Sequence, residues 1–361
     1  MAEIFYVYPR YKSVSFSLIG KQHIKYLSDK VKVQEIDEEA LDNIQWLRRR
    51  NILLHPILYN VIGDKIRQFE VRSKRLQRLL RVKNKLGGFE TADSNKISKV
   101  AVDALNQTDL VMVPSTFAQM SFKVSGVKAP IEVVPHGLND AMLVDDGITD
   151  PQILKIKKIK DEHDAKLILF FLIHSEFRKG ADIALEALRF IQMKYPNVYL
   201  VLKSQGEGGK MLEEFRKLRT IEVTSWLKDD VLRQLYDVCD VLIVPSRGGG
   251  FELNALEGVA RGLPTIVPNA GCFTDYINFC IPVNVSDRPR VFTDNPIHIG
   301  TGWEVSVDDL AYTLSNVLEE LDYFKEIAKT NATIARDRYN WRNICEKLYE
   351  ILKKYGFCDE G

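Results

Sequence analysis

The chain has 361 residues, of which 45% are hydrophobic and 27% are charged, and its formal net charge is +1. This length predicts two domains or three, and the composition is typical of a globular protein. It excludes a disordered tail protein, a collagen-like rod and a disulfide-stabilised miniprotein. The balance of 50 basic against 49 acidic residues argues against an electrostatic field over the whole protein that attracts nucleic acid.

The cysteines and the start of the chain bear on the cellular compartment. The five cysteines are dispersed, with no CxxC pair and no spacing typical of a metal site. Such a set fits a reducing compartment. Residues 2–8 have no basic segment and no long apolar core, and no run of about eighteen apolar residues follows. We therefore expect a cytoplasmic protein without a signal peptide or a membrane span.

Short apolar runs alternate with helix-length segments along the whole chain. In the first part the pattern predicts strands at 4–8, 52–54, 110–113 and 131–134 and helices at 20–27, 66–86 and 98–105. In the second part it predicts strands at 167–173, 198–203, 241–244 and 265–267 and helices at 183–193 and 211–218. Buried strands that alternate with helices are typical of parallel sheets. We therefore predict an α/β protein with two Rossmann-like, doubly wound domains.

A basic segment at 65–85 falls within one of the expected helices. Glu70 is its one acidic residue, and its nine cations are Lys65, Arg67, Arg72, Lys74, Arg75, Arg78, Arg81, Lys83 and Lys85. A basic amphipathic helix is typical of binding to a membrane surface, a nucleic acid or another anionic partner. The alternative is a solvated helix whose apolar stripe packs on its own domain. No aromatic residues are interleaved with these cations, which argues against nucleic acid.

Two adjacent cations, Arg178 and Lys179, follow the expected strand at 167–173 within the segment from His174 to Gly180. Lysine supplies a point charge and arginine a bidentate fork, so the pair suits a diphosphate. The alternative is a solvated basic loop. The carboxyl end of a strand favours the ligand site, because this edge is where such sheets bind their ligands.

A glycine-rich run from Pro245 to Glu257 follows the expected strand at 241–244. Three consecutive glycines between a strand and a helix let backbone N–H groups approach an anion at the helix N-terminus. Glu257 would lie one to two turns into this helix, where a carboxylate suits the paired hydroxyls of a ribose. The alternative is a flexible turn before an ordinary surface helix.

These motifs resemble the retaining GT-B glycosyltransferases of the group-one family, which includes many mannosyl- and glucosyltransferases. The family's Pro-Ser-x-x-Glu-Gly-Phe-Gly-Leu run, with a second Glu eight residues after the first, is matched here by Pro245-Ser246, Gly250-Phe251, Leu253 and Glu257. The stretch from Ala260 to Ile266 is similar to the family's Ala-x-Gly-x-Pro-Val-Ile. In the first half, residues 88–91 and 133–137 resemble a subgroup with an aromatic-Glu-Thr strand tip and a Val-Pro-His-Gly domain border.

The resemblance implies an enzyme that moves a sugar from a UDP- or GDP-sugar to a lipid, glycan or protein acceptor, with retention and without a cofactor or a metal. The absence of an Asp-x-Asp pair supports cationic side chains in place of the metal. The implied donor-binding residues are Arg178, Lys179, Gly248, Gly249, Gly250, Phe251, Leu253 and Glu257. Glu90 and Glu252 are the candidate catalytic carboxylates. Candidate contacts to the sugar, the acceptor or the donor phosphate are Gly20, in an expected glycine loop, His55, His136 and His174.

One departure from the family pattern leaves alternatives open. Gly249 stands where the family has its first Glu, and Glu252 is the candidate to supply the missing carboxylate from three residues on. A catalytically weakened sugar-nucleotide-binding or regulatory relative is the alternative. A sugar-nucleotide epimerase or hydrolase on the same fold is a further one.

The resemblance also implies a domain plan. We expect an acceptor-side domain at 1–145, a nucleotide-sugar domain at 146–338, and a C-terminal helix at 339–361 that packs back toward the first domain. The carboxyl ends of the strands would face each other across a ligand cleft. Because the basic segment lies in the acceptor half, an anionic membrane surface is a candidate partner, with peripheral association at the inner face of the membrane.

Overall fold

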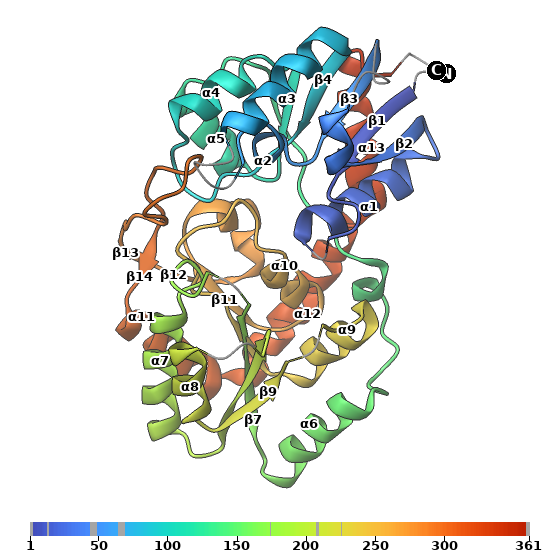
Figure 1. Cartoon of the computed structure of the whole chain (residues 1–361). Coiled ribbons are helices and arrows are strands. Elements are labelled where there is room, and N and C mark those ends of the chain that lie inside the picture. The colour runs from blue at the N-terminus through green and yellow to red at the C-terminus, as the bar shows by residue number, and fades with distance from the viewer. Residues whose placement is uncertain are drawn as a thin grey trace. The chain divides into compact units, whose positions relative to one another are not determined.

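The computed structural model describes residues 3–12, 14–43, 49–63, 69–173, 175–206, 209–224 and 226–358, apart from the side chains of residues 69–71 and 73. The chain divides into two units (Figure 1). The first consists of Met1–Gly137, Arg290–Thr301 and Trp341–Gly361, and the second of Leu138–Pro289 and Gly302–Asn340. The sequence placed the domain boundary at residue 145, whereas the first part of the first unit ends at Gly137. The first unit also includes Arg290–Thr301, a segment that was expected in the second domain.

The first unit is built on a six-stranded parallel sheet in the order β2-β1-β3-β4-β5-β6. Its strands are β1 (Glu3–Tyr8), β2 (Lys32–Asp37), β3 (Arg50–Leu54), β4 (Lys83–Phe89), β5 (Leu110–Val113) and β6 (Ile131–Val133). Its helices are α1 (Ser15–Leu27), α2 (Ile57–Val61), α3 (Phe69–Val82), α4 (Lys99–Leu105), α5 (Thr116–Ser125) and α13 (Trp341–Lys354). Helices α1 and α13 pack on each other, and α2 packs on α3 and α4. The return of α13 to this unit confirms the C-terminal crossing that the sequence predicts.

The second unit repeats this plan around a sheet in the order β12-β11-β10-β7-β8-β9, again parallel. Its strands are β7 (Lys166–Leu172), β8 (Val198–Ser204), β9 (Thr220–Val223), β10 (Val241–Ile243), β11 (Thr265–Pro268) and β12 (Ile281–Val283). Its helices are α6 (Pro151–Glu162), α7 (Ala181–Lys194), α8 (Lys210–Arg216), α9 (Asp229–Val238), α10 (Leu253–Ala260), α11 (Val307–Glu319) and α12 (Leu321–Arg338). A short hairpin of β13 (Val285–Asp287) and β14 (Glu304–Val305) follows the sheet. The predicted α/β architecture with two doubly wound sheets is confirmed.

The strands that the apolar runs predict are all present, but in the two six-stranded sheets the sequence missed β2, β4, β9 and β12. Three of these lie at sheet edges, where one side of the strand has no neighbour and polar residues are tolerated. The fourth, β4, lies where a helix was expected to continue to residue 86. Its first residues include Lys83 and Lys85, so the pattern of the preceding basic helix continues into the strand. In the structure, residues of Lys83–Phe89 pair with β3 and β5.

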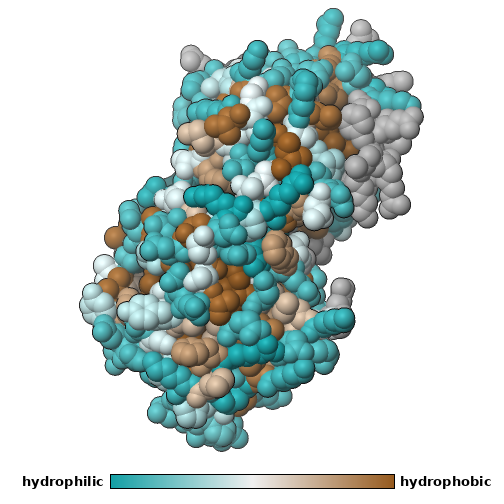
Figure 2. Space-filling model, turned by 90° about the vertical axis from the view of Figure 1, so that its left-hand side faces the viewer, coloured by the Kyte–Doolittle hydropathy of each residue, from teal (hydrophilic) through white to brown (hydrophobic). Residues whose placement is uncertain are grey.

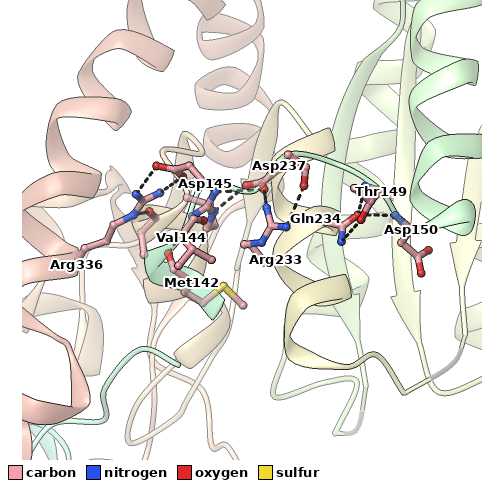
Figure 3. Close-up of polar contacts among 12 residues, drawn as sticks. Met142, Val144, Asp145, Thr149, Asp150, Arg233, Gln234, Asp237 and Arg336 are labelled. Carbon is pink, nitrogen blue, oxygen red and sulfur yellow. Dashed lines mark hydrogen bonds and ion pairs between the residues drawn. The ribbon is translucent and has the colours of Figure 1, made fainter. Parts of the chain in front are cut away.

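The segment after Leu138 is tied to the second unit by a polar network (Figure 3). Asp145 accepts from Arg261 at 2.8 Å and pairs with Arg336 at 3.0 Å. Arg261 also donates to the carbonyl oxygens of Met142 and Val144, at 3.0 and 2.8 Å. These contacts hold the main chain of this segment on α10 and α12, which explains why the boundary lies before it.

The same network continues toward α6 (Figure 3). Gln234 Oε1 accepts from the main-chain N–H groups of Thr149 and Asp150, both at 2.7 Å. Arg233 donates to the carbonyl oxygen of Gly147 at 2.9 Å. Both side chains come from α9, so this helix fixes the path of the chain into the second unit.

The segment at 290–301 is bonded to the first unit over residues 93–98. Ile297 is buried in the core of that unit, and Ser98 Oγ donates to the carbonyl oxygen of Pro296 at 2.7 Å. Asn95 Nδ2 donates to Thr301 Oγ1 at 3.0 Å. The sequence did not predict that this segment packs on the first unit. The segment forms neither a helix nor a strand of the main sheets, so it has no apolar periodicity to indicate its place.

Within the described part of the chain, no helix has both the length and the apolar character needed to cross a membrane. Figure 2 shows one face of the molecule, where hydrophilic residues cover most of the surface and apolar residues form separate patches.

Candidate functional site

Two loops meet where the strand order of the second sheet reverses. The chain runs outward from β7 through β8 to β9 and then returns to β10 on the other side of β7. In such sheets the carboxyl ends of the strands on either side of the reversal form the ligand site. The loops after β7 and β10 are the segments 175–180 and 244–252, so the two motifs singled out in the sequence lie together.

A glycine allows these loops to approach each other. Gly180 has φ of +69°, and a Cβ on it would lie 2.0 Å from the carbonyl oxygen of Pro245. A side chain is therefore excluded at this position by both conformation and space. The loops are further joined by the N–H of Arg247, which donates to the carbonyl oxygen of Arg178 at 2.7 Å.

The centre of the site is an ion pair between Lys179 and Glu252. Lys179 Nζ lies 2.8 Å from Glu252 Oε1 and 2.5 Å from Oε2. Ser246 Oγ donates to the same Oε1 at 2.9 Å. The Glu252 side chain is 2% exposed, whereas that of Lys179 is 19% exposed. The carboxylate is therefore enclosed and satisfied by its neighbours, while part of the Lys179 side chain is exposed.

The Glu252 carboxylate lies directly against Gly249. A Cβ on Gly249 would stand 2.6 Å from Glu252 Oε1 and 3.3 Å from its Cδ. The missing side chain at position 249 thus leaves the space that the carboxylate of Glu252 occupies. The main chain at Glu252 is held in turn by Tyr276, whose hydroxyl donates to the Glu252 carbonyl oxygen at 3.0 Å.

Arg178, expected to grip a diphosphate, is directed into the glycine run. Its side chain is buried, and its Nη1 donates to the carbonyl oxygen of Gly248 at 2.9 Å. A guanidinium placed on a main-chain carbonyl shapes the loop. Gly248, Gly249 and Gly250 are themselves buried, and α10 begins after them, at Leu253. The Phe251 ring lies 5.6 Å from that of Tyr276.

Arg247 holds the same loop and was missed by the sequence reasoning. It is buried, and it forms a bidentate pair with Asp182 at 2.6 and 2.8 Å. It also pairs with Glu304 and donates to the carbonyl oxygen of Phe177 at 2.8 Å, with its guanidinium 4.1 Å from the centre of the Phe177 ring. It is the one basic residue between Pro245 and Glu257, which is the signal that could have identified it.

Glu257 lies on α10, within the same unit. It is buried, and its Oε2 accepts from the hydroxyl of Tyr236 at 2.8 Å. Burial is the main cause that raises the pKa of Glu257 to about 7; the Tyr236 hydrogen bond lowers the pKa, and the nearby charge of Asp229 adds to the rise. This carboxyl group therefore changes charge near neutral pH. His174 lies outside the described residues.

In the first unit, Glu90 follows β4 and is buried. Its Oε2 accepts from the N–H of Leu58 at 2.5 Å, and its Oε1 from the N–H of Thr91 at 2.9 Å. The first of these contacts satisfies a donor at the start of α2. Burial raises the pKa of Glu90 to about 8, and the two N–H groups oppose that rise.

His55 belongs to a buried group with Tyr6 and His23. The Tyr6 hydroxyl lies 2.7 Å from Nδ1 of His55 and 2.8 Å from Nδ1 of His23. One hydroxyl has a single proton, so one Nδ1 accepts it and the other carries its own proton. Burial lowers the pKa of His23 to about 3 and that of His55 well below its ordinary value, so both rings are neutral. Neither Tyr6 nor His23 was anticipated.

The two other candidates in the first unit, Gly20 and His136, lie in closely packed surroundings. Gly20 lies inside α1, where a Cβ would stand 2.9 Å from the Tyr8 ring, so the expected glycine loop is wrong. His136 precedes Gly137, and a Cβ on that glycine would stand 2.6 Å from Cδ2 of Trp341. Burial lowers the pKa of His136 to about 3.

The basic segment is divided between structural and exposed cations. Arg75 is buried in a bidentate pair with Asp42 at 2.7 and 2.8 Å, and Lys83 pairs with Asp109 at 2.6 Å. The apolar residues Leu76 and Leu79 pack in the core of their own unit, which is the alternative that the sequence left open. The exposed side of α3 lines a groove of about 350 Å³ with Lys74, Gln77, Arg78 and Arg81. Lys65 and Arg67 lie outside the described residues.

Among the residues that the structure describes, no group of three or more His, Cys, Asp or Glu side chains is arranged to hold a metal ion.

Comparison with known proteins adds to this geometry. A family model described as "Glycosyl transferases group 1" matches residues 165–287, which include both loops of the site. The chain is 32% identical to the uncharacterized protein 356 of Sulfolobus islandicus rod-shaped virus 1, over 98% of each chain. It is 22% identical to an uncharacterized glycosyltransferase of Methanocaldococcus jannaschii, over 74% of this chain and 65% of the relative.

The fold has solved counterparts. The crystal structure of Anabaena HepE in complex with UDP and glucose matches with a TM-score of 0.68 at 16% identity, over 98% of this chain and 100% of that one. At this level of identity the likeness is one of fold.

Proposed function

The chain belongs to the glycosyl transferases of group 1, and we propose that it transfers a sugar from a nucleotide-diphosphate donor to an acceptor with retention of configuration. The donor class is a UDP- or GDP-sugar. The proposal is supported by the family match across the second unit and by the likeness of fold to HepE, a structure that contains UDP and glucose.

The observation that carries the proposal is the ion pair of Lys179 and Glu252 at the reversal of the strand order. Departure of a nucleoside diphosphate places negative charge on the leaving phosphate, and a cation held at that point stabilises it. Lys179 is partly exposed and is oriented by a buried carboxylate, so its ammonium group is held in place before the donor binds. In this proposal Lys179 does the work that a metal performs in other transferases.

Glu252 is proposed to supply the carboxylate that relatives carry at the position of Gly249. Its carboxylate lies where a side chain on Gly249 would project. From there it accepts hydrogen bonds from Lys179 and Ser246, and it orients the ammonium group of Lys179. Arg178 and Arg247 are positioning residues in this scheme, because both contact the loop itself.

The ribose of the donor is assigned to Glu257. A carboxylate accepts hydrogen bonds from two neighbouring hydroxyl groups, and Tyr236 holds one oxygen of Glu257 in place. On the acceptor side we assign Glu90 and the neutral imidazole of His55. Both oxygens of Glu90 accept main-chain N–H groups, which supports a positioning role in preference to that of a nucleophile.

Turnover of donor sugars tests the proposal. UDP-, GDP- and ADP-sugars are incubated with the protein and with lipid, glycan and protein acceptors, with and without a chelator, and nucleotide release and the anomeric configuration of the glycosylated acceptor are followed by NMR. We expect activity with at least one UDP- or GDP-sugar, unchanged by the chelator, and a product that keeps the donor configuration. Inversion, or activity that returns only on adding a divalent cation, contradicts the mechanism.

Variants of Glu252 and its neighbours test the assignment. Lys179→Ala and Glu252→Gln each remove one half of the ion pair, and we expect losses on the order of a hundredfold in kcat. The double variant Gly249→Glu with Glu252→Gly moves the carboxylate to the position that the family uses, and we expect it to regain part of the activity. Glu186→Gln, an exposed carboxylate on α7, is the matched control. Unchanged turnover in Glu252→Gln contradicts the role of Glu252.

The second candidate is a sugar-nucleotide-binding protein without transferase turnover. The replacement of the family's first Glu by Gly249 favours it. Tight binding of a nucleotide sugar in calorimetry without any product would support this alternative. Release of free sugar or of an epimer without an acceptor would instead support a hydrolase or an epimerase.

The exposed face of α3 is proposed to contact an anionic membrane surface that presents the acceptor. Three of its four groove residues are cations, and each contributes about 1 kcal/mol near an anionic surface. Because Leu76 and Leu79 are packed in the core, the contact would be electrostatic.

A further inference from the structure

Trp226 is a large aromatic side chain that is 68% exposed. It lies between the end of β9 at Val223 and the start of α9 at Asp229. The carboxyl edge of such a sheet is where its ligands bind, so the place of this exposed indole makes it a candidate ligand contact. Since β7, β8, β9 and β10 are parallel, Trp226 follows the same edge of the sheet as Lys179 and Glu252.

Helix α9 connects Trp226 to the proposed ribose site. Tyr236 of α9 donates to Glu257 Oε2 at 2.8 Å, and the charge of Asp229, in the first turn of α9, also acts on Glu257. A ribose held by Glu257 therefore lies beside α9. The base attached to that ribose must then lie over neighbouring surface, and the loop that enters α9 offers one exposed ring.

The loop around Trp226 is supported from the side of β8. A Cβ on Gly206, which follows β8, would stand 3.2 Å from Cβ of Thr224. Gly206 and Thr224 therefore lie side by side, and Thr224 is two residues before Trp226 along the chain. Leu227, the next residue along, is buried, so its side chain anchors the chain directly beside the exposed ring.

We propose that the indole of Trp226 is the stacking surface for the base of the donor nucleotide. The proposal rests on the proposed function, because it needs a nucleotide donor at Glu257. Stacking on an aromatic face tolerates different bases, since each base presents a π surface. The indole therefore adds affinity for uracil, guanine and adenine nucleotides alike, and the choice among bases comes from contacts to their edges.

Tryptophan fluorescence and calorimetry test this inference directly. The chain has four tryptophans, of which Trp303 and Trp341 are buried. We expect UDP to quench the fluorescence of the wild-type protein and pyrophosphate, which has no base, to leave it unchanged. Trp226→Ala should bind UDP about tenfold or more weakly, lose the quenching and bind pyrophosphate as the wild type does. Trp226→Phe, which keeps an aromatic face, should stay within a few-fold of the wild type.

The control is Phe190→Ala. Phe190 is 54% exposed on α7 of the same unit, near the end of the helix that leads into the start of β8 and thus toward the opposite edge of the sheet. It should bind UDP as the wild type does. UDP binding of unchanged affinity in Trp226→Ala would overturn the stacking role and leave the proposed function standing. If no nucleoside diphosphate binds the wild-type protein, the proposed donor and this inference both fail.

Discussion

A single methyl group at position 249 should disturb the centre of the site. In Gly249→Ala the added Cβ would stand 2.6 Å from Glu252 Oε1, and ordinary contacts begin at about 3.4 Å. The carboxylate must therefore retreat by about 0.8 Å. Its bonds to Lys179 at 2.5 Å and to Ser246 at 2.9 Å would then lengthen or break.

Both activity and stability should respond to that displacement. A misplacement of about 1 Å at a reacting centre costs on the order of a hundredfold in rate, so we expect kcat to fall by roughly ten- to a hundredfold. A buried carboxylate that loses a hydrogen bond costs about 1–3 kcal/mol, which lowers the Tm by several degrees in a unit of this size. Donor turnover and thermal unfolding measure the two effects.

Gly209→Ala is the matched control, because among the described residues its Cβ would meet only Glu176 Oε1, at 3.7 Å. The double variant Gly249→Ala with Glu252→Ala removes the clash, and we expect its Tm to exceed the value that the two single changes predict by addition. Wild-type turnover together with an unchanged Tm in Gly249→Ala would refute the placement of the carboxylate.

Three further predictions follow from the charged groups. Burial is the main cause that raises the pKa of Glu257 to about 7, so the affinity for a UDP-sugar, measured by calorimetry, should rise between about pH 6 and 8 as the carboxylate forms. Tyr236→Phe removes a hydrogen bond that lowers this pKa, so it should move the midpoint of that rise to higher pH. An affinity that does not change with pH contradicts the ribose assignment. The folded pKa of Glu90, about 8 against 4.5, means that the native state binds the extra proton, so stability falls as pH rises through this range, by at most about 5 kcal/mol. Glu90→Gln should flatten that slope in chemical denaturation, and an identical slope would show that another group is responsible. Reversal of the exposed charges on α3 should abolish flotation with anionic vesicles, which salt should also weaken; equal flotation with neutral vesicles excludes the electrostatic contact. The residues changed are Lys74, Arg78 and Arg81.

Local patterns were sufficient for the fold class. Apolar runs of four to seven residues predict buried strands because burial on both faces leaves little room for polar side chains. The ends of two such strands placed the cationic loop and the glycine run at the correct edge of the sheet, and the structure joins them at Gly180. Four strands were missed; three of them lie at sheet edges, and the fourth, β4, has a basic start that resembles the helix before it.

The amphipathic segment at 65–85 shows what local sequence patterns cannot predict. Its spacing predicts an apolar stripe, and a stripe can face either a membrane or the protein's own core. Tertiary packing decides this, because Leu76 and Leu79 are enclosed by their own unit. Among the described side chains of α3, the exposed ones include Lys74, Arg78 and Arg81, so the contact proposed here is electrostatic.

The sequence by itself determined two parallel α/β domains, the family and the position of the two motifs of the candidate site, because each depends on residues that are neighbours in the chain. The partners of the key side chains depended on the tertiary structure. Lys179 and Glu252 lie 73 residues apart, and Tyr6 and His55 lie 49 apart. Such pairs form because the order of the strands brings distant loops to the same edge of a sheet. The apolar periodicity along the chain does not predict the order of the strands.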